Sequence, residues 1–141
     1  MTSEHGTALA RLRDELRRPP FHQLLRPHAL SVDPDSGTVT IGLDYRDELA
    51  RGPNEKSFHG GVIATLIDMA GHAAVAIKIG KMAPTIDLRV DYLRPSAGEN
   101  LVASARLLQL GATFARVDVD VADAQGRLIA VGRGSFSTGR G

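Results

Sequence analysis

The sequence predicts an α+β domain in which a curled antiparallel sheet of six strands wraps around one long central helix. The run from Phe58 to Ile77 is apolar on almost every side, as expected of a helix buried inside a fold. Several segments on both sides of it alternate apolar and polar residues with period two, which is typical of strands. Most of these segments follow one another through short turns, and this order favours antiparallel pairing.

The chain has 141 residues, which suits one domain over residues 1–141, with residues 1–20 forming an N-terminal helical extension. Its formal net charge is +1 and it has no long run of like charge, so we expect neither a nucleic-acid nor a membrane partner. There is no cysteine, which excludes disulfides, thiolate catalysis and cysteine-ligated metals. The first ten residues lack the layout of a signal peptide, and we expect a cytoplasmic protein.

Two short helical segments are predicted before the first strand. Residues 7–18 form an amphipathic helix, because three leucines recur about one turn apart among charged residues. Two prolines end this helix. Residues 21–25 form a further helical turn, which is expected to dock Phe21, Leu24 and Leu25 on the core.

Six strands are predicted, two before the central helix and four after it. The first two, residues 28–32 and 39–43, form a hairpin, and residues 45–57 form a polar loop. The strand after the central helix should be half-buried, with Ile86, Leu88, Val90 and Tyr92 on one face. Gly132 and Gly134 in the last strand should mark bends or close approaches. The four strands after the helix cover residues 85–92, 101–110, 115–121 and 128–136.

The central helix carries one narrow polar stripe. Gly61, Thr65, Asp68 and His72 recur at i, i+4, i+7 and i+11, so they share one face. A lone carboxylate is costly to bury without a partner. Two interpretations stay open: the stripe meets solvent with Asp68 paired to a nearby base, or it lines a functional cleft.

Three segments together resemble the hotdog-fold acyl-CoA thioesterases of the phenylacetate-degradation (PaaI-like) type. They are His59–Gly61 with Asp68 nine residues after the histidine, the strand Thr85–Pro95, and the hairpin segment Gly126–Ala130. The resemblance covers nearly the whole chain from residue 20 onward. It implies a hotdog fold, hydrolysis of acyl-CoA to a carboxylic acid and CoA, and no cofactor beyond the CoA of the substrate. It also implies homodimers with active sites at their interface, which commonly assemble further into homotetramers.

Thioester hydrolysis needs an activated water and donors for the developing oxyanion. Backbone N–H groups at a helix start are unpaired, and glycine lets a ligand approach them, so Gly60 is the candidate oxyanion donor with Gly61 beside it. Asp68 is the candidate general base or nucleophile. Gly60 and Asp68 are eight residues apart, about 12 Å along one helix axis. A two-fold dimer with antiparallel helices would bring one subunit's Gly60 to its partner's Asp68.

Four further residues are candidates with alternatives. His59 either hydrogen-bonds a loop residue or the thioester, or it caps the helix start. The resemblance implies that Asn54 helps to place the carbonyl or the water, and that Thr85 lies near the water; Thr85 is otherwise an ordinary strand start. His72 either hydrogen-bonds Asp68, lines the acyl pocket or has a structural role. Asp68 and His72 at i, i+4 could ligate a metal, but no third ligand is evident, so no metal is expected.

Substrate contacts are assigned to stripe residues and to arginines. Guanidinium groups suit phosphate oxygens, so three arginines are candidates for the phosphates of CoA, with Arg94 preferred over the other two. The acyl pocket is expected to be lined by Ala64, Leu66 and Met69. The candidate substrate-binding residues are Gly61, Thr65, His72, Arg94, Arg116 and Arg133.

Two other classes of function stay open at this point. A non-catalytic acyl-CoA-binding module would share the fold without the hydrolysis. An enoyl-CoA hydratase or dehydratase of the hotdog type would use a histidine paired with an acid, and His72 with Asp68 leaves that option open. Fold alone does not decide between these classes.

Overall fold

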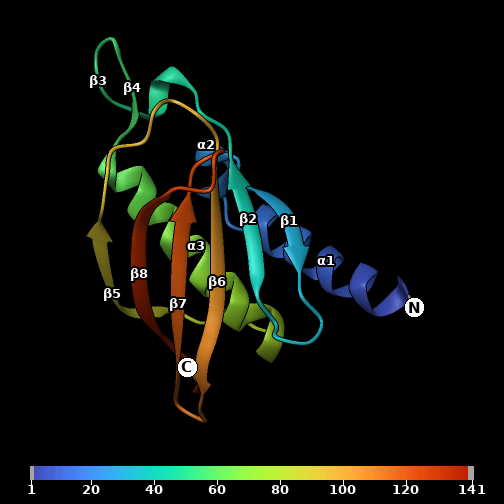
Figure 1. The fold of residues 1–141 in the computed structure, drawn as a ribbon. Coiled ribbons are helices and arrows are strands. Elements are labelled where there is room, and N and C mark those ends of the chain that lie inside the picture. The colour runs from blue at the N-terminus through green and yellow to red at the C-terminus, as the bar shows by residue number, and fades with distance from the viewer. Residues whose placement is uncertain (1, 140–141) are drawn as a thin grey trace.

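The computed structural model describes residues 2–139 and confirms the predicted architecture (Figure 1). An antiparallel sheet of six strands curls around one long helix, which lies on a single face of the sheet. The elements in chain order are α1 (Thr2–Arg17), α2 (His22–Leu25), β1 (His28–Val32), β2 (Val39–Leu43), the 3-10 helix η1 (Asp47–Leu49), β3 (Ala50–Gly52), β4 (Glu55–Phe58), α3 (Gly60–Ile79), β5 (Thr85–Tyr92), β6 (Leu101–Leu110), β7 (Phe114–Ala122) and β8 (Leu128–Ser137).

The strand order in the large sheet is β1-β2-β6-β7-β8-β5, and every neighbouring pair is antiparallel. On β7 the side chains of Ala115, Val117, Val119 and Val121 are buried, and this strand contacts α3. Burying each valine contributes about 1.5–3 kcal/mol relative to leaving it exposed. The alternation read from the sequence therefore fixes which face of β7 packs on the helix.

Helix α3 forms the centre of the core. It begins after His59 and ends at Gly80, whose φ of 77° is a left-handed conformation that favours glycine. Its length and composition would let it cross a membrane, yet 56% of its apolar window is buried inside the protein. The helix passes close beneath β8, where a Cβ on Gly132 would lie 2.6 Å from the Ile67 Cγ2 atom. The close approach predicted at Gly132 is therefore confirmed.

Strand β5 departs from the prediction of a half-buried strand. It is an edge strand, paired with β8 on one side only. The register jumps between Thr85 and Asp87, which leaves Ile86 in a bulge with its side chain 59% exposed. Tyr92 is also exposed, whereas Leu88 and Val90 pack partly against the core. The alternation of apolar and polar residues predicts which side chains share a face of β5, but it does not predict that β5 lies at the edge of the sheet.

The segment before β1 also differs in part from the prediction. Helix α1 begins at Thr2, earlier than the predicted start at residue 7, and it packs on β1 and α3. Of the apolar side chains in residues 21–25 only Leu25 docks on the core, because a single helical turn presents one side to it. The predicted docking of Phe21 and Leu24 is wrong, since these side chains are 52% and 63% exposed.

The segment predicted as a polar loop, residues 45–57, contains regular structure. It includes η1 and most of the hairpin of β3 and β4, which form a small separate sheet. Figure 1 shows this hairpin projecting beyond the end of the large sheet, above the start of α3. The hairpin leads directly into α3, so it helps to fix where that helix begins.

Candidate functional site

The start of α3 leaves one backbone N–H group free. The His59 imidazole Nδ1 atom accepts a hydrogen bond from the Gly61 N–H at 2.8 Å. The His59 carbonyl accepts from the N–H groups of Val62 and Ile63 at 3.0 and 3.3 Å. Among residues 2–139 no group accepts from the Gly60 N–H, which lies at the positive end of the helix dipole. The prediction that His59 caps the helix start is confirmed. Because His59 accepts from the next three N–H groups, the Gly60 N–H is the one left without an acceptor.

Tyr92 holds the same helix start from the side of β5. Its hydroxyl donates a hydrogen bond to the Gly60 carbonyl at 2.6 Å. A Cβ on Gly60 would lie 3.5 Å from the Tyr92 ring, so the ring packs directly on this peptide. Sequence analysis missed this contact and placed Tyr92 only on a face of its strand. The sequence carries no signal for this contact, because its two partners are 32 residues apart and Tyr92 is largely exposed.

Asp68 is bonded to a hydroxyl from the opposite end of β5. The Thr85 Oγ1 atom donates to Asp68 Oδ1 at 2.7 Å. Asp68 is half-buried, and among the side chains of residues 6–139 no cationic group forms an ion pair with it. The interpretation in which Asp68 is paired to a nearby base is therefore wrong. The carboxylate keeps one oxygen that no hydrogen bond within these residues occupies.

The rest of the polar stripe lies between these two ends. Gly61 is exposed and Thr65 is half-buried, with the Thr65 hydroxyl donating to the Gly61 carbonyl at 2.8 Å. The stripe therefore presents polar and small groups between the Gly60 N–H and the Asp68 carboxylate. Leu66 and Met69, expected to line an acyl pocket, are buried in the core instead, because they lie on other faces of α3.

His72 is enclosed one turn beyond Asp68. Its Nε2 atom accepts from the Ala83 N–H at 3.1 Å, and its Nδ1 atom lies 3.4 Å from Glu15 Oε2 on α1. Burial lowers the pKa of the His72 imidazole below its ordinary value, while the carboxylates of Glu15 and Asp68 act in the opposite direction. These contacts match the structural role considered for His72, and no hydrogen bond joins it to Asp68 within residues 2–139.

A hollow of about 360 Å³ opens beside the helix start. Arg94 lines it together with Gly60 and Tyr92, so the preferred phosphate-binding arginine borders the same hollow as the start of α3. Arg51 also lines this hollow, although its guanidinium pairs with Glu55 at 2.9 Å. Arg51 was not among the predicted residues, because the hairpin that carries it was read as a loop.

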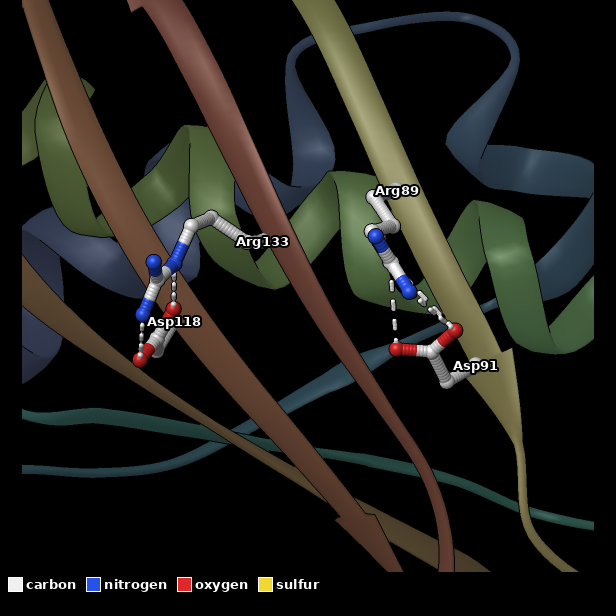
Figure 2. A network of polar contacts seen from close by, with 4 residues as sticks. All are labelled: Arg89, Asp91, Asp118 and Arg133. Carbon is white, nitrogen blue, oxygen red and sulfur yellow. Dashed lines mark hydrogen bonds and ion pairs between the residues drawn. The ribbon is translucent and has the colours of Figure 1, made fainter.

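Arg133 lies elsewhere, on the face of the sheet turned away from α3 (Figure 2). Arg116 lines the same shallow hollow as Arg133. Arg133 donates to both oxygens of Asp118, at 2.6 and 3.0 Å. These hydrogen bonds hold the pKa of the Asp118 carboxyl below its ordinary value. Figure 2 shows a second pair, Arg89 with Asp91, on the same face. The structure thus does not bring Arg116 or Arg133 to the polar stripe of their own subunit.

Asn54 lies at the tip of the β3–β4 hairpin, where its φ of 62° is a left-handed conformation that asparagine tolerates. Its side chain is exposed, and no hydrogen bond joins it to Gly60 or Asp68 within the described chain. Among the side chains of residues 6–139 there is also no group of three histidine, aspartate or glutamate residues close enough to hold a metal ion.

The geometry therefore defines two half-sites on one helix. One half is an unpaired N–H at a helix N-terminus, which suits a developing negative charge. The other half is a carboxylate bonded to a hydroxyl, which suits proton abstraction from water. In one protomer they are separated by two turns of α3.

Comparison with known proteins identifies the class of this protein. Residues 55–130 match the family profile of the thioesterase superfamily. A putative esterase of Halobacterium salinarum is 40% identical over 127 residues, which cover 82% of this chain and 83% of the relative. The human acyl-coenzyme A thioesterase 13 is 36% identical over 80 residues, covering 55% of this chain and 57% of the relative. The chain belongs to the thioesterase superfamily, and the protein is a thioester hydrolase.

Solved structures agree with this classification. A protein described as belonging to the thioesterase superfamily superposes with a TM-score of 0.87 at 37% identity, over 93% of this chain and 98% of that chain. The PaaI protein of Escherichia coli, from the phenylacetic acid degradation operon, shares the fold with a TM-score of 0.82 at 23% identity, over 95% and 94%. The predicted resemblance to PaaI-like hotdog thioesterases is confirmed.

Proposed function

We propose that the protein hydrolyses an acyl-CoA thioester to a carboxylic acid and free CoA, in an active site built by two subunits. One observation carries the proposal: a single helix holds a free N–H at Gly60 and a hydroxyl-bonded carboxylate at Asp68. The name of the human relative, an acyl-coenzyme A thioesterase, supports the substrate class. The chemistry needs no cofactor beyond the CoA of the substrate.

The two half-sites must come from different chains to act on one bond. Eight residues of α3 separate Gly60 from Asp68, about 12 Å along the helix axis. A base and an oxyanion donor must each lie within roughly 3 Å of the reacting atoms. A two-fold dimer with neighbouring antiparallel α3 helices meets this requirement.

The free edge of β5 could pair with the same edge of a second subunit to form this dimer. Thr85 at its first end is bonded to Asp68, and Tyr92 at its last end is bonded to Gly60. Antiparallel pairing of two β5 edges about a two-fold axis would put the Thr85 end of one subunit beside the partner's Tyr92. The Asp68 of one subunit would then approach the partner's Gly60.

The edge of β5 also has the surface that such pairing needs. Its unpaired backbone groups are a template for a further strand. Large apolar side chains lie exposed on and next to it: Met82 is 61% and Ile86 59% exposed. Burying such side chains between subunits favours a homodimer. The family resemblance adds that two dimers assemble into a homotetramer.

In the proposed reaction Asp68 takes a proton from a water molecule, whose oxygen attacks the thioester carbonyl carbon. The Thr85 hydroxyl orients the carboxylate, and the partner's Gly60 N–H stabilises the negative oxygen of the tetrahedral intermediate. The C–S bond then breaks, and CoA leaves as a thiol once it takes up the proton. Arg94, in the hollow beside Gly60, is the proposed contact for the CoA phosphates.

Purified protein, a panel of acyl-CoA substrates and a free-thiol assay test this proposal. Asp68→Asn keeps the shape but removes the base, so thiol release should fall by several powers of ten, as is usual for loss of a catalytic group. Asp120→Asn, an exposed aspartate on the far face of the sheet, is the matched control and should release thiol at the wild-type rate. Binding without thiol release would instead indicate an acyl-CoA-binding module, and a change in enoyl absorbance would indicate a hydratase.

A further inference from the structure

His72 links the N-terminal helix to the start of β5 and has no part in the proposed chemical step. Its ring is packed between α1, the segment before β5 and the Phe136 ring of β8. The His72 side chain is 15% exposed and the Glu15 side chain is 7% exposed. Glu15 pairs through Oε1 with Arg18 Nη1 at 3.2 Å, which leaves its other oxygen, Oε2, facing the His72 ring. A buried carboxylate is costly without partners, and Glu15 has one at each of its two oxygens.

The two nitrogens of His72 have fixed roles. The Ala83 N–H points at Nε2, so Nε2 accepts and carries no proton. The neutral ring must then carry its proton on Nδ1, which faces the Glu15 carboxylate at 3.4 Å. A carboxylate can only accept, so Glu15 and Ala83 select the same tautomer.

The His72–Ala83 and Asp68–Thr85 hydrogen bonds both join α3 to the chain that enters β5. Asp68 and His72 are four residues apart on α3, about 6 Å along the axis. Ala83 and Thr85 are two residues apart, about 6.6 Å in extended chain. Because the two spacings match, the His72–Ala83 and Asp68–Thr85 hydrogen bonds can form together. They bind the chain to α3 at two successive points just before and at the start of β5.

We propose that Glu15 and His72 are positioning residues for the hydrolytic site: Glu15 fixes the tautomer of His72, and His72 holds Ala83 so that the Thr85 hydroxyl stays on Asp68. This inference rests on the proposed role of Asp68. It makes the N-terminal helix part of the active-site architecture, since Glu15 belongs to α1.

The arrangement predicts a dependence of turnover on pH. Protonated His72 would carry a proton on Nε2, opposite the Ala83 N–H, so the hydrogen bond would be lost. The charged and titratable groups around the ring are Glu15 on α1, Arg18 just after α1, His22 on α2 and Asp68 on α3. Burial lowers the pKa of His72, so this loss falls below the ordinary imidazole value of about 6.5.

Variants of His72 and Thr85 test the proposal by thiol release between pH 4.5 and 8, a range that spans the ordinary imidazole pKa of about 6.5. His72→Leu removes the acceptor and should lower kcat by up to about 100-fold with KM little changed, because it misplaces Thr85 without touching substrate. His72→Gln places an amide oxygen where Nε2 lies, so it should restore most of kcat and extend activity to lower pH. In a Thr85→Ala background, His72→Leu should cost little more, because both changes act through one hydroxyl.

Histidine spectra of ¹⁵N-labelled protein give a measurement independent of activity. Nε2 of His72 should be the unprotonated nitrogen at neutral pH, and Glu15→Gln should make its protonation occur at lower pH, because it removes the carboxylate that favours the charged ring. Asp14→Asn, an exposed neighbour on α1, and His28→Gln, an exposed histidine on β1, are the matched controls and should leave both readouts unchanged.

The proposal is overturned if His72→Leu and His72→Gln both keep wild-type kcat and the wild-type pH profile. It is also overturned if the His72→Leu and Thr85→Ala losses simply add. If His72→Leu does not fold, the pH profile of His72→Gln and the spectra still decide. If the proposed function is wrong but the His72 contacts are right, the result differs: Asp68→Asn would keep wild-type turnover, while the spectra would still show the proton of His72 on Nδ1.

Discussion

Tyr92→Phe tests whether the contact from β5 to the start of α3 serves catalysis. The substitution removes the hydroxyl that donates to the Gly60 carbonyl at 2.6 Å and keeps the ring that packs on Gly60. A neutral hydrogen bond contributes about 0.5–1.5 kcal/mol net. If that energy holds the Gly60 peptide in its reactive position, kcat should fall about two- to tenfold.

The assay is thiol release from an acyl-CoA at saturating substrate, with thermal unfolding measured in parallel. Tyr45→Phe is the matched control, because its hydroxyl donates to the Glu55 carbonyl at 3.4 Å and touches neither half-site. We expect Tyr45→Phe to keep wild-type kcat and Tyr92→Phe to lose activity while remaining folded. Equal kcat for both variants would refute the positioning role of the Tyr92 hydroxyl.

Two further predictions concern stability. Gly132→Ala should destabilise the protein by about 1–3 kcal/mol through overpacking, because the new Cβ would lie 2.6 Å from an Ile67 methyl and 3.0 Å from the Arg89 carbonyl oxygen; urea unfolding measures this, and an unchanged midpoint would contradict the close approach. The ion pair of Asp118 with Arg133 should stabilise the fold above the ordinary carboxyl pKa of about 3.9 and lose that effect as pH falls through the lower folded-state value. Wild-type and Asp118→Asn unfolding curves should therefore differ at pH 6 and converge as acid is added, and a constant difference would contradict the assignment.

Local patterns in the sequence predict much of this fold. The valines of β7 alternate strictly, so their strand and its buried face follow from period two alone. The apolar run of α3 predicts a core helix because few other environments accept a helix that is apolar on nearly every side. The spacing of Gly60 and Asp68 even predicts that two subunits must cooperate, since it follows from the rise of a helix.

The remaining features depend on contacts between segments far apart in the chain. Nothing local to Ile86 reveals that its strand lies at the sheet edge or contains a bulge, because sheet order follows from the pairing of distant strands. Tyr92 and Glu15 were missed for the same reason: their partners, Gly60 and His72, lie 32 and 57 residues away. Leu66 and Met69 were placed at the cleft because the apolar faces of α3 look alike in the sequence.

Subunit complementation tests the shared active site most directly. Asp68→Asn and Gly60→Val are each expected to abolish turnover, because one removes the base and the other crowds the oxyanion donor. When the two proteins are mixed equally under proven subunit exchange, half of the dimers contain both chains, and each such dimer has one intact site. The account predicts recovery of roughly one quarter of wild-type thiol release per subunit. No recovery despite exchange would contradict it, because Gly60 and Asp68 would then act within one chain or not at all.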